Sequence, residues 1–385
     1  MVDLTASERQ VLDIIWRRGP IARGDLATAT GLTGATITRV IQSVSRTKLI
    51  TDTVLRDGMR GQPVRPLQIV PHAAYSIGVY FSHHHAEIGL VDLGGTIHAI
   101  ARHQILEADV ESISKLTRDF VDKVVGDGLV PKGQLVGIGL ALPGDFIGGP
   151  RRLNAHAFFP KLRDRDLYAE FQARSSYKVF IENDAASAAL GERALGSGHD
   201  IDSFIFVHVG HGIGGGIILN GKLYRGTNGN AGMVGIQFPN DKPRPSGQDL
   251  FAHLQQHNFE INDFNELDRL QVHGCPPLKS WIRRAGMQLR QQLSITARLI
   301  DPSAIIIGGR IPSAIAQGLT AEIDGPGFCD EGQGFSKPRV LASTLGPMAG
   351  LVGAACVPFV DTFFATKEAG AIAPQLAINA SLQRI

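Results

Sequence analysis

The order of local patterns in the first seventy residues most constrains the fold of this chain. Three short amphipathic helical segments precede two strand-like segments. Ser7 is predicted to cap the first helix, which ends before Gly19-Pro20. The second helix is predicted over residues 23–29, with Leu26 facing inward. Elements this short share one small core, so residues 1–72 are predicted to form a separate domain.

The third helix is predicted to begin at Thr33, its N-cap, and to end near Ser45. Gly31 before it allows the positive φ of a tight turn. The apolar residues recur with helical spacing and are expected to be buried: Ile37, Val40, Ile41 and Val44. The opposite face offers side chains that suit base edges and phosphates in a major groove, namely Thr33, Thr36, Thr38, Arg39 and Gln42.

Two predicted strands, over residues 49–55 and 66–70, flank a turn at 56–61. Arginines on or near this hairpin could enter a minor groove or grip phosphate: Arg56, Arg60 and Arg65. The first seventy residues hold ten Lys and Arg against six Asp and Glu, a net charge of +4, and the remainder carries −2. The pattern predicts a winged helix-turn-helix that binds double-stranded DNA. A packing module whose Thr and Arg residues are merely solvated is the alternative.

With 385 residues the chain is too long for one core. Its three cysteines are scattered without a C-x-x-C pair, which indicates a reducing compartment. The start of the chain has no apolar signal segment, and no apolar run is judged long enough to cross a bilayer. The protein is therefore expected to be cytoplasmic, with no membrane partner.

The remaining sequence, residues 73–385, contains the same order of predicted elements twice. A three-strand meander followed by helical segments occurs twice, which predicts two similar α/β lobes, roughly 73–190 and 191–385, with a cleft between them. A buried strand over residues 179–184 ends in polar groups and leads into a helix of small residues. Such strand ends are where α/β folds place ligands.

Several motifs carry a family resemblance over nearly the whole chain. They are Glu182-Asn183-Asp184-Ala185, Gly212-Ile213-Gly214-Gly215-Gly216, Gly221-Lys222-Leu223-Tyr224-Arg225-Gly226, Ala231-Gly232 and Ile305-Ile306-Ile307-Gly308-Gly309. The chain resembles the ROK family of repressors and sugar kinases, in its repressor branch. The resemblance implies an α/β fold: an N-terminal winged helix-turn-helix followed by a two-lobed actin/hexokinase-like (ribonuclease H-like) body.

The resemblance also indicates which residues a catalytic member of the family would need. Asp184 matches the position of the family's catalytic base, and Asn154 and Asn183 match its sugar-contacting positions. The first phosphate loop is missing, because residues 80–85 contain neither the Asp nor the glycines of the family's pattern. Asp92-Leu93-Gly94-Gly95-Thr96 spells that pattern but falls one hairpin later, so it is predicted to be a turn. We therefore expect no ATP cofactor, no kinase activity and only a vestigial base.

A second glycine loop, residues 210–216, fits either a phosphate loop or a close-packed hairpin turn. The family's zinc site is lost, since Met233 and Ile236 replace its Glu and His and no cysteine lies between Ile236 and Cys275. The pair His253 and His257 is expected at the surface, so no metal is predicted. Met233 and Ile236 are instead expected to make the effector pocket more apolar.

The wing also departs from the family, which has Arg where this chain has Gln62; Arg60 or Arg65 could substitute. Together these features predict a transcriptional repressor that is controlled by a carbohydrate-like effector and binds its operator as a homodimer or homotetramer. One alternative is an ATP-dependent hexose kinase that uses Asp184 as its base. Another is an interaction protein whose winged helix binds a protein.

Overall fold

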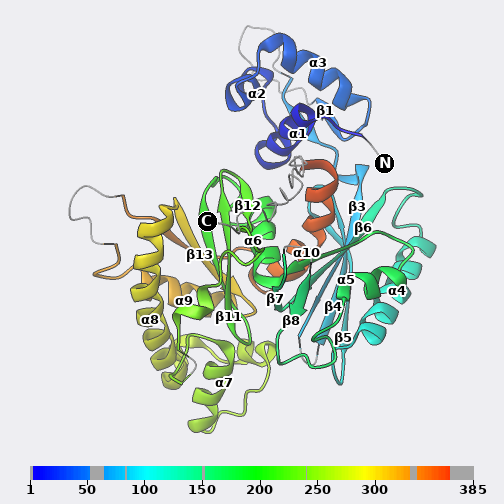
Figure 1. Cartoon of the computed structure of the whole chain (residues 1–385). Helices are drawn as coiled ribbons and strands as arrows, with labels where there is room; N and C mark the ends of the chain where they lie inside the picture. The colour runs from blue at the N-terminus through cyan, green and yellow to red at the C-terminus, as the bar shows by residue number, and fades with distance from the viewer. Residues whose placement is uncertain are drawn as a thin grey trace, which may run out of the picture.

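The computed structural model describes residues 3–52, 65–82, 85–149, 152–239, 241–329 and 336–364. A small N-terminal module sits on top of two α/β lobes, and two helices, α6 and α10, lie at the centre between the lobes (Figure 1).

The N-terminal module contains three helices and a two-stranded antiparallel ladder. These are α1 (Ala6–Arg18), α2 (Arg23–Thr30), α3 (Gly34–Ser45), β1 (Ile50–Asp52) and β2 (Leu67–Ile69). The prediction that Ser7 is the N-cap of α1 is wrong, because Ser7 lies inside the helix. Thr5 caps it in a capping box, because the Thr5 side chain accepts from the Glu8 backbone while the Glu8 carboxylate reaches back to Thr5. Arg56, Arg60 and Gln62 lie outside the described residues.

The first lobe is built on a five-stranded sheet of order β5-β4-β3-β6-β9. The meander β3–β4–β5 is antiparallel, and β6 and β9 add in parallel. The bounds are β3 Tyr75–Phe81, β4 His85–Asp92, β5 Ile97–Gln104, β6 Leu135–Leu142 and β9 Val179–Asn183, with helices α4 Val110–Gly126 and α5 Leu167–Ala173, the short pair β7 Gly144–Phe146 and β8 Leu153–Ala155, and the 3-10 turn η1 Pro71–Ala73.

The second lobe repeats this plan with a sheet of order β12-β11-β10-β13-β14. Again an antiparallel meander comes first, and β13 and β14 add in parallel. The bounds are β10 Phe204–Val209, β11 Ile213–Leu219, β12 Lys222–Tyr224, β13 Ala304–Gly309 and β14 Arg339–Ala342, with α7 Gly247–Gln256, α8 Pro276–Ile300, α9 Ser313–Ile323 and the 3-10 turns η2 Val234–Gln237, η3 Phe264–Arg269 and η4 Val272–Gly274. The structure thus confirms the predicted repeat, because the two sheets have the same topology.

The helices α6 (Asp184–Leu195) and α10 (Ala349–Phe359) pack against each other at the centre. Their crossing is close, since a Cβ atom on Gly353 would overlap the backbone carbonyl of Ser187. η5 (Gly346–Met348) precedes α10, and the π-helical turn η6 (Val360–Phe364) follows it. α10 also packs on β3 and β6, so the last described helix belongs to the first sheet rather than to a second lobe running from residue 191 onward.

By length and composition alone, the segment Gly346–Phe364 is apolar enough to cross a membrane, so the prediction that no apolar run reaches that length is wrong. In this fold 72% of its most apolar 18-residue stretch is buried inside the protein. α10 contacts α6 on one side and the first sheet on another, so its apolar composition is that of a core helix.

Candidate functional site

The exposed face of α3 presents the side chains that the sequence predicted for DNA contact. Thr33 caps the helix by accepting from the Thr36 backbone at 3.3 Å. Thr33, Thr38, Arg39 and Gln42 are exposed and Thr36 is half-buried, while the four predicted apolar residues face the core. Among the described residues Arg39 has no ion-pair partner. The guanidinium of Arg39 is therefore available to an outside acceptor.

Near the ladder, Arg65 is exposed and its Nη1 lies 3.5 Å from Asp52 Oδ2. A pair this exposed and this long is weak, so it leaves the arginine available for phosphate. The tip of the predicted wing falls outside the described residues, and the roles of Arg56 and Arg60 stay predictions.

The second candidate site lies where β9 ends and α6 begins. Asn183 is the N-cap of α6: its Oδ1 accepts from the backbone of Ala185 at 2.9 Å and of Ala186 at 3.0 Å. Its Nδ2 donates to the Gly144 carbonyl at 2.8 Å. Both ends of the amide are thus engaged by the protein itself, and their role here is to hold Asp184 in place as the first residue of the helix.

Asp184 faces a group of residues that sequence reasoning missed. Its Oδ2 lies 3.9 Å from Nε2 of His208 on β10, and that nitrogen is 3.4 Å from the Tyr80 hydroxyl on β3. The Arg310 guanidinium lies 5.2 Å from the centre of the Tyr80 ring. Each of these side chains comes from a different element, so the two sheets jointly build the site. A lone histidine in the apolar strand 204–209 was the one available sequence signal.

Burial controls the protonation of this group. It lowers the pKa of His208, against the attraction of Asp184, so the imidazole is neutral near pH 7. Burial also raises the pKa of Tyr80 far above its ordinary value, so the hydroxyl keeps its proton. Nδ1 of His208 is buried without a hydrogen-bond partner among the described residues. The site therefore offers two neutral hydrogen-bonding groups, Tyr80 and His208, beside the Asp184 carboxylate and the Arg310 guanidinium.

Two further contacts join the lobes around this point. Arg225, after β12, binds the buried Glu182 carboxylate on β9 at 2.6 Å. Asn230 exchanges two hydrogen bonds of 2.7 Å with the backbone of Phe146 on β7. These contacts connect the segment 225–232 of the second lobe to the first lobe beside the site.

The other predicted effector residues lie differently. The Asn154 amide exchanges two hydrogen bonds with Asp164, at 3.1 and 2.7 Å. Met233, which precedes η2, and Ile236, within it, are 42% and 79% exposed. The structure does not gather these three around Asp184 by any described contact, and their role in effector binding stays a prediction.

The glycine-rich segment 210–216 forms the β10–β11 hairpin. Its carbonyls accept from the first amides of α7: Gly210 from Gly247 at 2.8 Å and His211 from Gln248 at 3.0 Å. A Cβ on Gly216 would lie 2.6 Å from that of Ala189, so this glycine lets α6 approach β11 closely. The close approach of α6 at Gly216 favours the interpretation as a close-packed hairpin turn.

The segment Asp92–Thr96 is the β4–β5 turn, as the sequence predicted. Asp92 Oδ1 accepts from the Thr96 backbone at 2.9 Å, and Gly95 has φ +91°. The sequence predicts that the family's first phosphate loop is absent from the connection between β3 and β4. His83 and His84 of that connection lie outside the described residues, so this stays a prediction.

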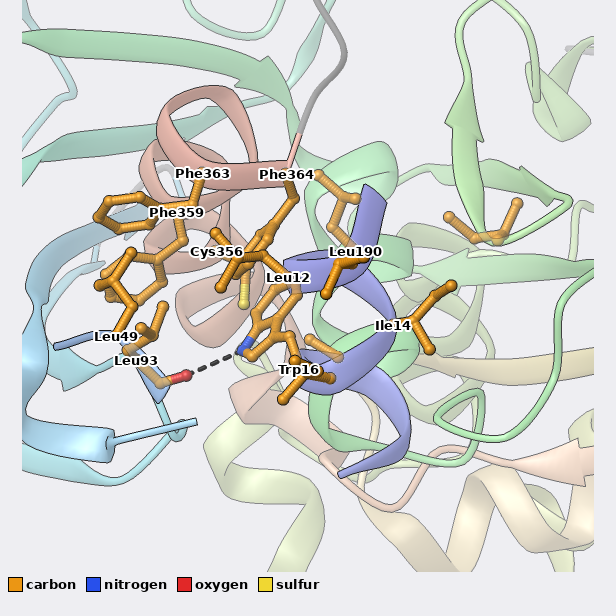
Figure 2. Close-up of a cluster of buried hydrophobic side chains, with 14 of the residues drawn as sticks. Leu12, Ile14, Trp16, Leu49, Leu93, Leu190, Cys356, Phe359, Phe363 and Phe364 are labelled. Carbon is orange, nitrogen blue, oxygen red and sulfur yellow. Dashed lines mark hydrogen bonds between the residues drawn. The ribbon is translucent and has the colours of Figure 1, made fainter. Parts of the chain in front are cut away.

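The N-terminal module docks on both lobes through α1. Figure 2 shows Trp16 stacked on Phe364, with the side chains of Leu190 on α6 and Cys356 on α10 nearby. The two ring centroids are 4.3 Å apart, and the indole Nε1 donates to the Leu93 carbonyl at 2.8 Å. The apolar core of the module is therefore continuous with that of the body.

An ion-pair network lies beside this cluster. Arg193 of α6, only 3% exposed, binds Asp13 of α1 at 2.5 Å, and Arg17 binds Asp13 at 3.0 Å. Arg17 and Arg18 both reach Asp202 before β10, at 2.8 and 2.6 Å. Burial would raise the pKa of Asp202, but the two arginines outweigh it and hold the pKa below its usual range.

Residues 76–357 match the profile of the ROK family. The chain belongs to the ROK family. It is 30% identical to the xylose repressor of Bacillus subtilis, over 93% of this chain and 95% of that protein. In fold it is similar to a ROK family transcriptional regulator described as a homologue of the E. coli MLC protein, with a TM-score of 0.68, 22% identity and coverage of 92% of this chain and 95% of that one.

A ROK hexokinase from Thermus thermophilus is similar as well, with a TM-score of 0.58 and 23% identity, but it covers 74% of this chain and 98% of its own. The two-lobed body is therefore common to ROK kinases and ROK regulators. The likeness to the regulator and to the xylose repressor extends over more than nine-tenths of the chain.

Proposed function

We propose that this chain is a sequence-specific DNA-binding transcriptional repressor controlled by a sugar or a sugar-derived effector, acting in the cytoplasm. The observation that carries the proposal is the near full-length likeness to a repressor, together with an exposed α3 face on a module docked to a sugar-kinase-like body. The N-terminal module, residues 1–72, acts as a winged helix-turn-helix, with α3 in the major groove and Arg65 on the flanking backbone.

Anisotropy titration of duplex DNA from the promoter of its own operon, at several salt concentrations, tests DNA binding. Arg39→Ala should weaken operator binding about 5- to 150-fold, as expected for loss of one bidentate base contact. Arg118→Ala removes another exposed arginine, on α4, so it makes the same charge change outside the N-terminal module and should bind like the wild type. Equal affinities for the two variants would contradict α3 as the reader, and binding that ignores salt would point to a protein partner instead.

The effector binds beside Asp184, His208 and Tyr80. A carboxylate next to neutral hydrogen-bonding groups suits the hydroxyls of a carbohydrate. The ligand differs from a plain hexose held in the family's usual way, because Met233 and Ile236 stand where the family has polar groups. Calorimetry with a panel of sugars and sugar phosphates tests this: Asp184→Asn should abolish the response to the ligand found. Tight binding of unmodified glucose would contradict the altered pocket.

The body binds this ligand without phosphorylating it. The amides at the start of α7 are occupied by the hairpin carbonyls, and the glycine pattern Asp92–Thr96 lies in a different turn. A coupled kinase assay with the effector and ATP should give the same background rate for the wild type and for Asp184→Asn. Sugar-dependent ATP consumption that disappears in Asp184→Asn would support the kinase alternative.

The effector signal reaches DNA through α6. Asp184 is its first residue, and Arg193, more than two turns later, holds Asp13 of α1. A ligand that shifts α6 moves the anchor of the N-terminal module, and so changes the spacing of paired modules on two half-sites. We propose a homodimer or homotetramer for this reason. Light scattering with and without operator DNA would test it, and a monomer on DNA would contradict it.

A further inference from the structure

Three side chains outside both proposed sites converge at the junction of the N-terminal module and the body. Asp92 at the end of β4 has a fully buried side chain, and its Oδ1 is used by the turn. Its Oδ2 lies 2.8 Å from Nε2 of His98 on β5 and 3.4 Å from Nδ1 of His72 in η1. The three potential ligand atoms lie within 4.8 Å of one another.

A single histidine–aspartate hydrogen bond would be an ordinary way to satisfy a buried carboxylate. Here two rings from separate elements, inclined at 64°, meet at one carboxylate oxygen. Among the described residues neither Lys nor Arg pairs with Asp92. A fully buried carboxylate without a permanent cation is unfavourable, and a bound cation would offset that cost.

The spacing of the donors fits one class of ion. Zinc binds imidazole and carboxylate at about 2.0–2.2 Å in a tetrahedron, whose edges are then about 3.3–3.6 Å. The separation of 3.4 Å between His72 and Asp92 matches that edge, and the separation of 2.8 Å between His98 and Asp92 is shorter, so binding of the ion requires a small shift of the His98 ring. Two imidazoles with one carboxylate suit zinc and similar divalent transition metals, whereas Mg²⁺ and Ca²⁺ prefer oxygen ligands alone.

We propose that His72, Asp92 and His98 form a binding site for a divalent transition-metal ion of the zinc type, with water in the fourth position. Binding replaces the contact between Nδ1 of His72 and the Tyr75 hydroxyl, now 3.2 Å apart. The site differs in position from the lost zinc cluster near Met233, and it departs from the sequence-based expectation of no metal.

The location gives such an ion a structural consequence. His72 belongs to the segment that leaves β2, while Asp92 and His98 belong to the body. The same turn accepts the Trp16 indole at Leu93, and the Leu93 backbone donates to the Pro71 and Ala74 carbonyls at 3.0 and 2.9 Å. A metal there would tie the connecting segment to the surface on which α1 docks.

The experiment uses the full chain, without an affinity tag and after removal of metals with a chelator. Calorimetry with Zn²⁺ should show one site per chain, and Co²⁺ should give the visible absorption of a tetrahedral nitrogen and oxygen site. His72→Ala should weaken Zn²⁺ binding about tenfold or more, by analogy with the loss of supporting groups at metal sites. His72 is 65% exposed, so this variant should fold, which circular dichroism would verify.

His253→Ala is the matched control. His253 lies on α7, and its ring is 4.7 Å from that of His257, the residue that follows the helix, so this pair could bind metal at the surface. This variant should bind Zn²⁺ like the wild type, and Asp92→Asn should bind as weakly as His72→Ala. Absence of Zn²⁺ binding, or equal affinity in the wild type and His72→Ala, would overturn the proposal and leave a hydrogen-bonded Asp–His cluster.

Discussion

Removing the Asp13 carboxylate should undock the N-terminal module, because it leaves the Arg193 guanidinium buried without its counter-charge. Arg193 is 3% exposed, its Nε already lacks a partner among the described residues, and Asp13 is its one ion-pair partner there. Arg17 is less affected, since it keeps Asp202. Breaking a buried pair from one side costs about 3–5 kcal/mol. Asp13→Asn should therefore lower the free energy of unfolding by about 3–5 kcal/mol, which raises the equilibrium constant for unfolding about a hundredfold or more.

Urea unfolding followed by tryptophan fluorescence measures this, since Trp16 lies at the interface. Arg18→Ala is the control, because it removes only an exposed pair with Asp202, which is worth less than about 1 kcal/mol. Replacing both partners by apolar residues, Asp13→Leu with Arg193→Met, should recover most of the stability. If Asp13→Asn is as stable as Arg18→Ala, then the buried pair does not hold the module on the body.

Two further predictions concern the centre of the molecule. Burial lowers the pKa of His208 in the folded state, so below pH 6.5 the unfolded state takes up a proton that the folded state does not. The free energy of unfolding is therefore unaffected by His208 above pH 6.5. It falls below that pH by at most about 1.4 kcal/mol per pH unit. In His208→Gln the free energy of unfolding should fall less steeply between pH 6.5 and 5.5 than in the wild type. An unchanged slope would mean that the pH dependence comes from other groups, such as His211, whose pKa is also lowered by burial. Gly353→Ala should destabilise the fold by about 1–3 kcal/mol because its methyl group would meet the Ser187 backbone, whereas Gly126→Ala, with open space around it, should not; equal melting temperatures would show that α6 and α10 can separate without cost.

The sequence was sufficient wherever the signal is local. The Thr33 cap, the buried face of α3 and the two meanders follow from periodicity and turn residues within a few positions, and the structure confirms them. It misplaced the cap of α1, because Thr5 and Ser7 both suit that role and only Thr5 has Glu8 at the right distance for a capping box.

Local patterns alone determined that this chain has a small basic helical module and two strand–helix lobes with a polar strand end between them. Only the tertiary structure decided which distant residues meet: Tyr80 with His208, His72 with Asp92, and α10 with the first sheet. The physical reason is that these contacts join elements far apart in the chain, and their geometry depends on how helices and sheets pack to remove apolar surface from water. Packing of this kind has no period that can be read along the chain.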